Sequence, residues 1–404
     1  MDSRIGRPGT ADLAPEFASV TLDRRRFLVV LGGVATLHAL APSLAWARHG
    51  TNTLPSLQPW MLPDALPANP IEAGRALVGA AVLAPSHWNA QPWRFEVDTS
   101  ELRILLDPQR VLPLDDPDQR FAQMSLGAAL ENLLVAARAW GQQPSVRYLP
   151  WGIAPRPGTS LVAAAVSWKV GERARDRLLF PALTERRTNA HPYDGRAITI
   201  PSRGQLLAQV GEEVRVHWLE DRGDINAVGE LVHDAVVQVM SDRAAQAERV
   251  LWLRDSEGDA RAHGDGITAE RLGLGGPARW FAGHSLQPDS RFYGWGASSM
   301  AKDTRDLVRS SGALALLTLP ARSDAGWIMG GQAYERFALR ASTLGIAQQP
   351  LAAPVASTRH RPLLARRFHA DGEEPLLLVR LGHAKAPAAT PRRGVALVST
   401  YRTS

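Results

Sequence analysis

The chain of 404 residues contains no cysteine. The absence of thiols excludes disulfides, thiolate catalysis, iron–sulfur clusters and cysteine-ligated zinc sites. Aromatic residues are sparse, at 6%, and charged residues make up 21% of the chain. With 45% hydrophobic residues, this composition is typical of a globular protein with a large core. The length suits two or three domain equivalents.

A continuous basic run is also missing, although the formal net charge is +6 and the pI is about 10.1. A high pI can favour contact with nucleic acid or membranes. Here the arginines are spread along the chain, no nucleic-acid-binding motif is present, and an arginine-biased proteome accounts for the charge. No third ligand accompanies His263 and Asp265 at a spacing suited to a metal. We therefore predict neither a nucleic-acid partner nor a metal site.

Residues 1–47 have the organisation of an export signal. The sequence Asp-Arg-Arg-Arg-Phe-Leu (23–28) precedes an apolar run (29–46) that ends in an Ala-Trp-Ala cleavage pattern at 45–47. The run is too short and wrongly flanked for a membrane-spanning helix. Paired arginines before Phe-Leu resemble a twin-arginine signal, which exports folded proteins. We predict recognition by the twin-arginine export machinery and a periplasmic location in a bacterium; an uncleaved anchor is the alternative.

After a proline-rich linker or arm (48–69), the chain repeats an order of elements. Segments 127–141 and 331–345 both have apolar residues at helical spacing, and both begin and end with glycine. Each ends at a glycine that suits a left-handed C-cap. Gln-Gln-Pro follows soon after in both, and strands are then expected over 161–168 and 375–381. Chance similarity of two amphipathic helices is the alternative, but the repeated order indicates two related α+β halves.

The segment 85–95 reads Pro-Ser-His-Trp-Asn-Ala-Gln-Pro-Trp-Arg-Phe and leads into a strand-like stretch, 93–97. It places hydroxyl and amide groups between two prolines and beside a flat apolar surface, as binding of an aromatic cofactor requires. The segment closely resembles the PSxxNxQPWxF loop of the nitroreductase family, which binds flavin mononucleotide (FMN) at a subunit interface. A purely structural loop is the alternative.

The resemblance implies an α+β, nitroreductase-like fold in which two fused halves, 70–183 and 184–393, form an intrachain pseudo-dimer. Ordinary members are homodimers, so a duplicated chain is expected to be a monomer. Duplication together with a twin-arginine signal is similar to the Acg-type branch of the family. Residues 225–300 carry few family landmarks, and we expect a lid over the site to come from there. Residues 394–404 are expected to be a C-terminal tail.

The resemblance divides one FMN site between the halves. From the first half, Pro85, Ser86, His87 and Asn89 are implied to contact the flavin ring and ribityl chain, with Gln91 and Trp93 as scaffold. The second half supplies Arg186, Arg187 and Thr188, since guanidinium groups bind phosphate oxygens in pairs. Each half lacks the other's element, so we predict one FMN per chain. Ordinary surface arginines are the alternative for the phosphate residues.

Three further groups are implied more weakly. Leu351 and Ala352 match a loop whose backbone N–H approaches flavin N5. Arg392 and Arg393 resemble a terminal basic segment and would compensate for Ala190, which stands where the family has a basic residue; a solvated tail is the alternative. Aromatic residues that either cover the flavin or pack in the core are Trp280, Phe281, Phe292, Tyr293 and Trp295.

The resemblance implies an FMN-dependent oxidoreductase. A donor, NAD(P)H or another reductant, passes hydride to flavin N5, and a nitroaromatic, quinone or similar small molecule is the acceptor. No catalytic side chain is required; His87 is either a proton donor or a ring-positioning residue. Because NAD(P)H is cytoplasmic and the chain is expected outside the cytoplasm, FMN storage without turnover is the second reading. A cofactor-free protein used for interaction is the third.

Overall fold

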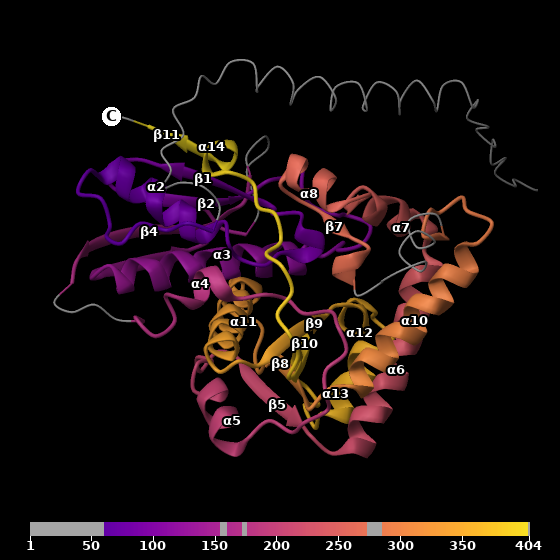
Figure 1. Cartoon of the computed structure of the whole chain (residues 1–404). Coiled ribbons are helices and arrows are strands. Elements are labelled where there is room, and N and C mark those ends of the chain that lie inside the picture. Colours follow the sequence, from indigo (N-terminus) through magenta and orange to yellow (C-terminus); the bar gives the residue numbers. More distant parts are fainter. Residues whose placement is uncertain (1–59, 154–159, 172–175, 273–284, 403–404) are drawn as a thin grey trace, which may run out of the picture. The chain divides into compact units, whose positions relative to one another are not determined.

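Two β-sheets, each with one long helix against it, organise the described part of the chain (Figure 1). The computed structural model describes residues 60–153, 160–171, 176–272 and 285–402. These residues belong to one compact unit, Pro55–Ser404. The expected export signal, Trp280 and Phe281 lie outside the described residues. Within those residues, no helix has the length and apolar character needed to span a bilayer.

The first sheet and its helices form what we call the first lobe. Its strands are antiparallel except for β11, which runs parallel to β1. Their spatial order is β11 (Ser399–Tyr401), β1 (Trp93–Val97), β2 (Leu102–Leu106), β4 (Val162–Val170) and β3 (Gln142–Tyr148). Its helices are α2 (Pro70–Ala81), α3 (Arg120–Ala139), the short α14 (Val395–Val398) and the 3-10 turn η2 (His87–Asn89).

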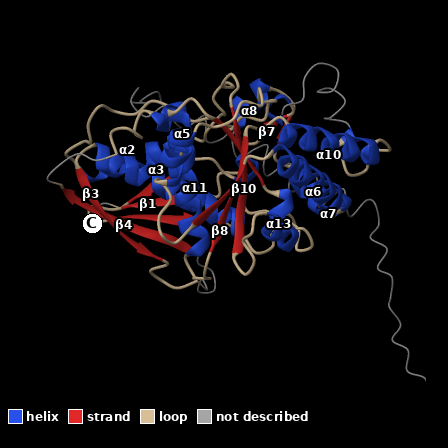
Figure 2. Ribbon diagram, turned by 90° about the horizontal axis from the view of Figure 1, so that it is seen from below, coloured by secondary structure: helices blue, strands red, loops and turns tan. Residues whose placement is uncertain are grey.

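The second sheet is antiparallel and forms the second lobe. Its strands in spatial order are β5 (Arg215–Leu219), β8 (Ala313–Leu319), β10 (Glu374–Gly382) and β9 (Ala347–Leu351). The helices with it are α4 (Ala182–Glu185), α5 (Ile200–Leu207), α6 (Arg222–Ser241), α10 (Tyr293–Arg309), α11 (Gly326–Thr343), α12 (Ala353–Ala356) and α13 (Arg361–Arg367). Figure 2 shows the strands of the two sheets as separate groups.

The α+β class is confirmed. In each lobe a long helix, α3 or α11, ends at a glycine in the left-handed region, Gly141 (φ 77°) or Gly345 (φ 67°), as the sequence predicted. The chain then enters an edge strand, β3 or β9, that pairs with β4 or β10. Each Gln-Gln-Pro lies inside that edge strand, which the sequence interpretation missed. The repeated order is compatible with two fused related halves.

The long helices α3 and α11 cross in backbone contact. A Cβ added to Gly127 would lie 1.9 Å from the carbonyl oxygen of Ile328, and one added to Gly331 would lie 2.0 Å from that of Met124. Each helix also supplies residues to the core of the other lobe: Ile328 packs with the first-lobe core and Phe121 with the second. The apolar core of each lobe therefore includes residues from the long helix of the other lobe.

The stretch 225–300, from which a lid was expected, contains two kinds of structure. One part packs into the core, and only the other part is placed where a lid could be. Helices α6 and α10 pack into the core beside the second sheet, with Val228, Val232 and Val308 fully buried. The remaining part follows α6 and consists of α7 (Arg243–Val250), β6 (Leu253–Arg254), α8 (Glu257–His263), β7 (Ile267–Thr268) and η3 (Glu270–Leu272). We call residues 243–272 the insertion.

The C-terminal residues are not a loose tail, in contrast to the sequence expectation for 394–404. After β10 the chain runs through 383–394, enters α14 and adds β11 to the edge of the first sheet, with Phe95 opposite Ser399. In Figure 1 this yellow segment runs from the second sheet to the first. Three residues are too few for a hydrophobic pattern to indicate a strand, so the sequence offered no signal for this pairing.

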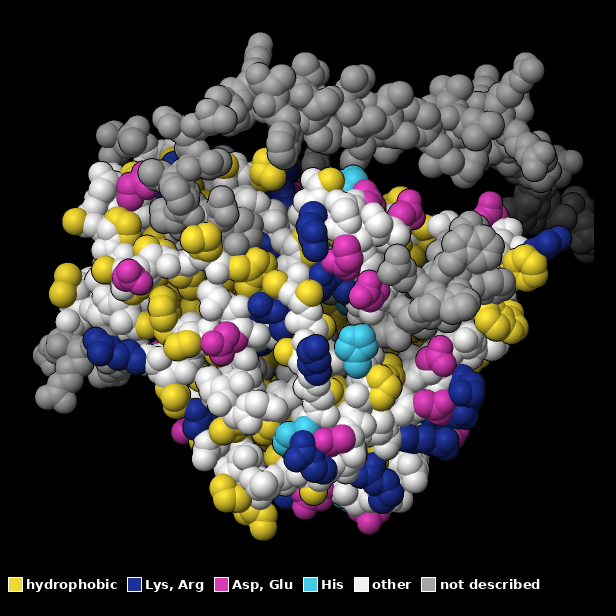
Figure 3. All heavy atoms as spheres, in the orientation of Figure 1, with side chains coloured by type: hydrophobic (Ala, Val, Ile, Leu, Met, Phe, Trp, Pro, Cys, Tyr) yellow, Lys and Arg dark blue, Asp and Glu magenta, His cyan; other side chains and the backbone are white. Residues whose placement is uncertain are grey.

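Charged side chains of both signs are mixed on the face of the molecule that Figure 3 shows. The described Lys and Arg side chains on this face lie between Asp and Glu side chains and patches of apolar surface.

Candidate functional site

A cavity of about 600 Å³ lies where both lobes, the insertion and the C-terminal segment meet. Its volume falls in the range of small-molecule sites. Its lining includes Pro85, Ser86, His87, Trp88 and Asn89; Arg186, Arg187 and Thr188; Glu257, Arg261 and Arg271; and Thr390 and Arg392. The cavity therefore gathers the two elements that the sequence assigned to different halves.

The loop before β1 holds its polar groups in a constrained backbone. Trp88, Asn89 and Gln91 have φ values of 52°, 52° and 53°, a region that costs free energy for residues other than glycine. Gln91 fixes this shape: its N–H donates to Ser86 Oγ (2.9 Å) and its side chain donates to the Gly264 carbonyl (2.8 Å). This geometry agrees with the scaffold role expected for Gln91.

Asn89 joins three segments of the chain. Its Nδ2 donates to the carbonyls of Gly266 (3.0 Å) and Pro391 (3.2 Å), and its Oδ1 accepts from Arg392 Nη1 (3.0 Å). Both amide hydrogens are therefore used within the protein. The residue lines the cavity, but its side chain holds the loop, the insertion and the C-terminal segment together.

His87 and Trp88 share a carboxylate that the sequence did not single out. Asp115 Oδ2 lies 2.7 Å from His87 Nε2 and accepts from Trp88 Nε1 at 2.9 Å. Its Oδ1 pairs with Arg249 of the insertion at 2.6 Å. Burial opposes ionisation of Asp115, but the bond and charge of His87 and the charge of Arg249 outweigh it, so the pKa of the carboxyl lies well below its usual value.

Arg186 is buried beside the carboxylate of Glu335 from α11. Its Nε lies 3.2 Å from Glu335 Oε1, and the two side chains are 3% and 0% exposed. Burial raises the pKa of Glu335 to about 7, against the opposing charges of Arg186 and Arg392. The paired glutamate reduces the positive charge that Arg186 offers to a ligand, although Arg186 does line the cavity.

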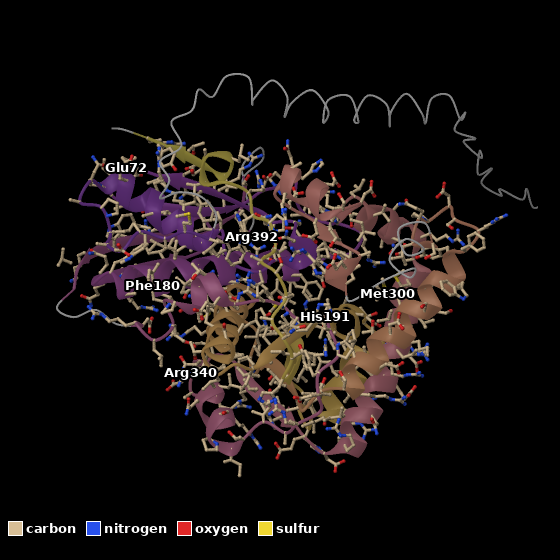
Figure 4. The ribbon with its side chains drawn as sticks, in the orientation of Figure 1. Glu72, Phe180, His191, Met300, Arg340 and Arg392 are labelled. Carbon is tan, nitrogen blue, oxygen red and sulfur yellow. The ribbon has the colours of Figure 1, made fainter. Side chains whose placement is uncertain are left out.

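Arg187 and Arg392 carry charges that no carboxylate contacts among the described residues. Arg187 Nη1 donates to the carbonyls of Thr184 and Arg186. Burial, then the neighbouring Arg186 and Arg271, lowers the pKa of Arg187 to about 10. Burial and Arg186 also lower the pKa of Arg392, whose Nε is buried without a partner. Figure 4 marks Arg392 on the C-terminal segment.

Trp60 covers both of these arginines. Its ring centroid lies 4.3 Å from the guanidinium carbon of Arg187 and 5.3 Å from that of Arg392. Trp60 is the first residue of the chain that the structure describes. It falls in the stretch that the sequence predicted as a linker or arm. Single tryptophans in proline-rich segments carry no positional signal, so only the structure reveals this contact.

The remaining predicted residues divide between cavity and scaffold. Thr188 and Ala352 line the cavity. Leu351 is buried in β9 opposite Leu378 and is not among the lining residues. Arg393 is also absent from the lining; its N–H donates to Gln91 Oε1, and its Nη2 to the Leu397 carbonyl.

The aromatic residues proposed to cover the flavin lie elsewhere, as far as they are described. Tyr293 is buried, and its hydroxyl donates to the Met240 carbonyl. Phe292 and Trp295 are 42% and 60% exposed. None of the three lines the cavity; that place is taken by Trp60, Trp88 and Phe121.

Arg271 fastens the insertion to the C-terminal segment. Its Nε and Nη2 donate to the two oxygens of Glu257, at 2.9 and 2.7 Å. Nη1 donates to the Ala388 carbonyl and to Thr390 Oγ1, and Nη2 also donates to the Ala389 carbonyl. All five N–H groups of the guanidinium are therefore used. We call this set of contacts the Arg271 latch.

The donor set suits an anionic ligand. Around the cavity, burial and the charges of Arg186 and Arg271 lower the pKa of Arg187 and Arg392. Glu335 pairs with Arg186, and Glu257 pairs with Arg271. A phosphate dianion supplies the missing negative charge and accepts paired guanidinium hydrogen bonds. Among the described residues, no group of three or more ligating side chains is arranged for a metal ion. The residues thus fit the phosphate end of FMN.

Sequence similarity to proteins named as nitroreductases supports the nitroreductase family for this chain. One relative, from Mycobacterium tuberculosis and assigned by name as an NAD(P)H nitroreductase, is 26% identical over 334 residues, which cover 81% of this chain and 91% of the relative. The protein acg of the same organism, also so assigned, is 31% identical over 121 residues, or 30% of this chain and 35% of the relative. No protein-family model matches.

Among solved structures, the FMN-dependent nitroreductase NfnB of Mycobacterium smegmatis, in complex with NADPH, aligns with a TM-score of 0.34. The alignment has 12% identity and covers 56% of this chain and 98% of that chain. A nitroreductase-assigned protein of Anabaena variabilis aligns with a TM-score of 0.41 and 8% identity, over 70% of this chain and 69% of that chain.

Proposed function

We propose that the chain is an FMN-dependent oxidoreductase that binds one FMN in the cavity and reduces a nitroaromatic, a quinone or a similar small acceptor. One observation carries the proposal. Arg187 and Arg392 meet at a cavity that also contains the Pro85–Asn89 loop, and no described carboxylate contacts either guanidinium. The names of the relatives support the same reaction class.

When bound, FMN supplies the hydride chemistry, and this chain's residues supply binding and shape. Arg187 and Arg392 would hold the phosphate, with Thr188 as a hydroxyl donor. Pro85, Ser86 and His87 would lie against the flavin, and Ala352 would place its backbone near the ring. The insertion and Trp60 would exclude water, which strengthens every electrostatic contact inside the cavity.

We also propose that residues 1–47 are a twin-arginine signal and that the protein works in the periplasm. A protein exported after folding would take up FMN in the cytoplasm and carry it across. NAD(P)H would then be absent from its working compartment, so another donor would be required. The halves 70–183 and 184–393 are proposed as a pseudo-dimer that makes a partner subunit unnecessary.

FMN storage without turnover is the second candidate function. The Arg271 latch favours it, because three of its hydrogen bonds join the insertion to residues 388–390 beside the cavity. A closed insertion would retain bound FMN and would keep acceptors out. Storage and turnover share the same binding residues, so they differ only in the response of the bound flavin to a donor.

Two measurements on the purified protein test these proposals. The first is the FMN released per polypeptide after denaturation, expected to be one; a colourless protein favours the cofactor-free reading, and two FMN refute the single-site proposal. The second is anaerobic titration with NADPH. Bleaching of the flavin absorption band supports the enzyme. An unchanged spectrum supports either storage or a different electron donor. Reduction with stoichiometric dithionite, followed by addition of a quinone, then distinguishes these two.

The binding residues are tested by Arg187→Ala, with Arg366→Ala as the matched control. Arg366 is exposed on α13 and is not among the cavity-lining residues. We expect Arg187→Ala to lose FMN on gel filtration while the control retains it, since a hydrogen bond to a charged group contributes about 1.5–3 kcal/mol. Equal retention by both variants would remove Arg187 from the site.

A further inference from the structure

His87 and Asp115 form a hydrogen-bonded pair on the cavity wall that FMN binding alone does not explain. The carboxylate is 6% exposed and the imidazole 18% exposed. The imidazole stacks on Phe121, with ring centroids 4.9 Å apart and planes at 28°. The backbone N–H of His87 lies 3.3 Å from Ser125 Oγ, to which it donates. The stacking on Phe121 and the hydrogen bond to Asp115 therefore fix the plane of the imidazole and the direction in which its Nε2 points.

The pair determines which ring nitrogen of His87 titrates. Asp115 is ionised because its pKa is lowered, as described above, so its oxygens only accept hydrogen bonds. Nε2 of His87 must therefore carry a hydrogen in both the neutral and the charged ring. The proton that His87 gains and loses is the one on Nδ1. No hydrogen bond joins Nδ1 to the described part of the chain.

The charged groups around His87 come from two segments of the chain. Asp115 and Asp116 follow β2, and burial raises the pKa of the Asp116 carboxyl. Arg249 and Glu248 belong to α7; Arg249 pairs with Asp115, and Glu248 Oε2 accepts from the Asp115 N–H at 2.8 Å. Arg249 thus balances the charge of Asp115. The imidazole of His87 keeps its hydrogen bond to Asp115, and no other described cation contacts the ring.

We propose that His87 donates a proton from Nδ1 to the acceptor that is reduced in the cavity, and that Asp115 is the positioning residue that fixes its tautomer. This proposal rests on the proposed function. A quinone takes a hydride, which is one proton with two electrons, from the reduced flavin. Its second oxygen takes the proton of Nδ1, which gives the hydroquinone. His87 is left neutral, still donating Nε2–H to Asp115, and is protonated again from solvent.

The test compares two acceptors with flavin-loaded protein that has been reduced with stoichiometric dithionite. A quinone needs the proton, whereas ferricyanide takes electrons alone. For His87→Gln we expect quinone reoxidation to slow about 100-fold and ferricyanide reoxidation to stay unchanged. Asp115→Asn slows the quinone reaction too. His191→Gln is the matched control, because His191 lines the same cavity and no described carboxylate contacts its side chain.

A second readout does not depend on activity. Nitrogen-15 NMR of the imidazole rings distinguishes the protonated nitrogen. We expect the Nε2 of His87 to stay protonated throughout the titration, with Nδ1 as the titrating atom. In Asp115→Asn both tautomers of the neutral ring should appear. A neutral ring protonated on Nδ1 in the parent protein would overturn the tautomer assignment and, with it, the proton-donor role.

The outcomes separate this proposal from the one on which it rests. A parent protein without flavin, or with a flavin inert to both acceptors, refutes the proposed function and the His87 proposal together. A reactive parent whose His87→Gln variant keeps the quinone rate within about threefold refutes the proton-donor role alone. An equal loss with both acceptors also refutes it, because such a loss indicates a structural role.

Discussion

The guanidinium carbon of Arg187 lies 4.3 Å from the ring centroid of Trp60. Cation–π contacts of this kind contribute about 0.5–2 kcal/mol, and Trp60 also contacts Arg392. The indole therefore orients two of the cavity's positive charges and shields them from water. A residue at the start of the described chain thus helps to build a site whose other parts lie far along the sequence.

Replacing this ring should weaken FMN binding. We expect Trp60→Ala to raise the Kd for FMN about 3- to 30-fold, equivalent to the loss of about 0.5–2 kcal/mol. Trp60→Phe should keep part of the effect because it retains an aromatic face. Quenching of flavin fluorescence on titration measures both. An unchanged Kd in Trp60→Ala would show that the indole does not support the anion site.

Opening the Arg271 latch should speed the release of FMN. In Arg271→Ala the insertion loses its three hydrogen bonds to residues 388–390 and two internal ones to Glu257, so we expect the dissociation rate to rise at least about tenfold. Arg261→Ala is the control, since Arg261 lines the cavity but is exposed. Stopped-flow dilution into apoflavodoxin measures the rates. Equal rates in the two variants would contradict a closing role for the latch.

The contact between α3 and α11 should not tolerate a methyl group. Because the Cβ of Gly331→Ala would overlap the Met124 backbone, the helices must separate, and we expect a loss of about 1–3 kcal/mol in the free energy of unfolding. At Gly204 of α5, an added Cβ would meet no atom within 4 Å. Gly204→Ala should therefore stabilise the protein by about 0.5–1 kcal/mol. Urea denaturation followed by circular dichroism measures both.

Glu335 should make stability depend on pH. Burial raises its pKa to about 7 from the ordinary value of 4.5, so the folded state holds a proton that the unfolded state has lost. The stabilisation is complete below about pH 4.5 and declines as the pH rises towards 7. Glu335→Gln should remove this decline. Thermal unfolding of both proteins from pH 5 to 8 tests it; parallel pH profiles would contradict the raised pKa.

Local patterns in the sequence were sufficient for some of the helices and strands and for two parts of the cavity lining. The helical spacing in 127–141 and 331–345 corresponds to α3 and α11, and the strands expected over 161–168 and 375–381 correspond to β4 and β10. Residues 85–89 and Arg186, Arg187 and Thr188 lie at one cavity, although their roles in binding stay predictions.

Contacts between distant segments could not be predicted. Asp115, Glu335 and Arg271 are ordinary charged residues in the sequence, and only the fold brings them to His87, Arg186 and Glu257. Conversely, Asn89 and Arg393, expected at the flavin, use their polar groups to join loops. The sequence identified polar groups of suitable chemistry, but it did not show whether other parts of the chain already satisfied them.

The parallel pairing of β11 with β1 constrains when the protein can mature. Residues 399–401 pair with 95–97, so the edge of the first sheet stays unfilled until residues 399–401 have been synthesised. Arg392, which precedes this strand, reaches the cavity equally late. The wall of the cavity is therefore completed only after the residues that join it from 85–89 and 186–188 have long left the ribosome.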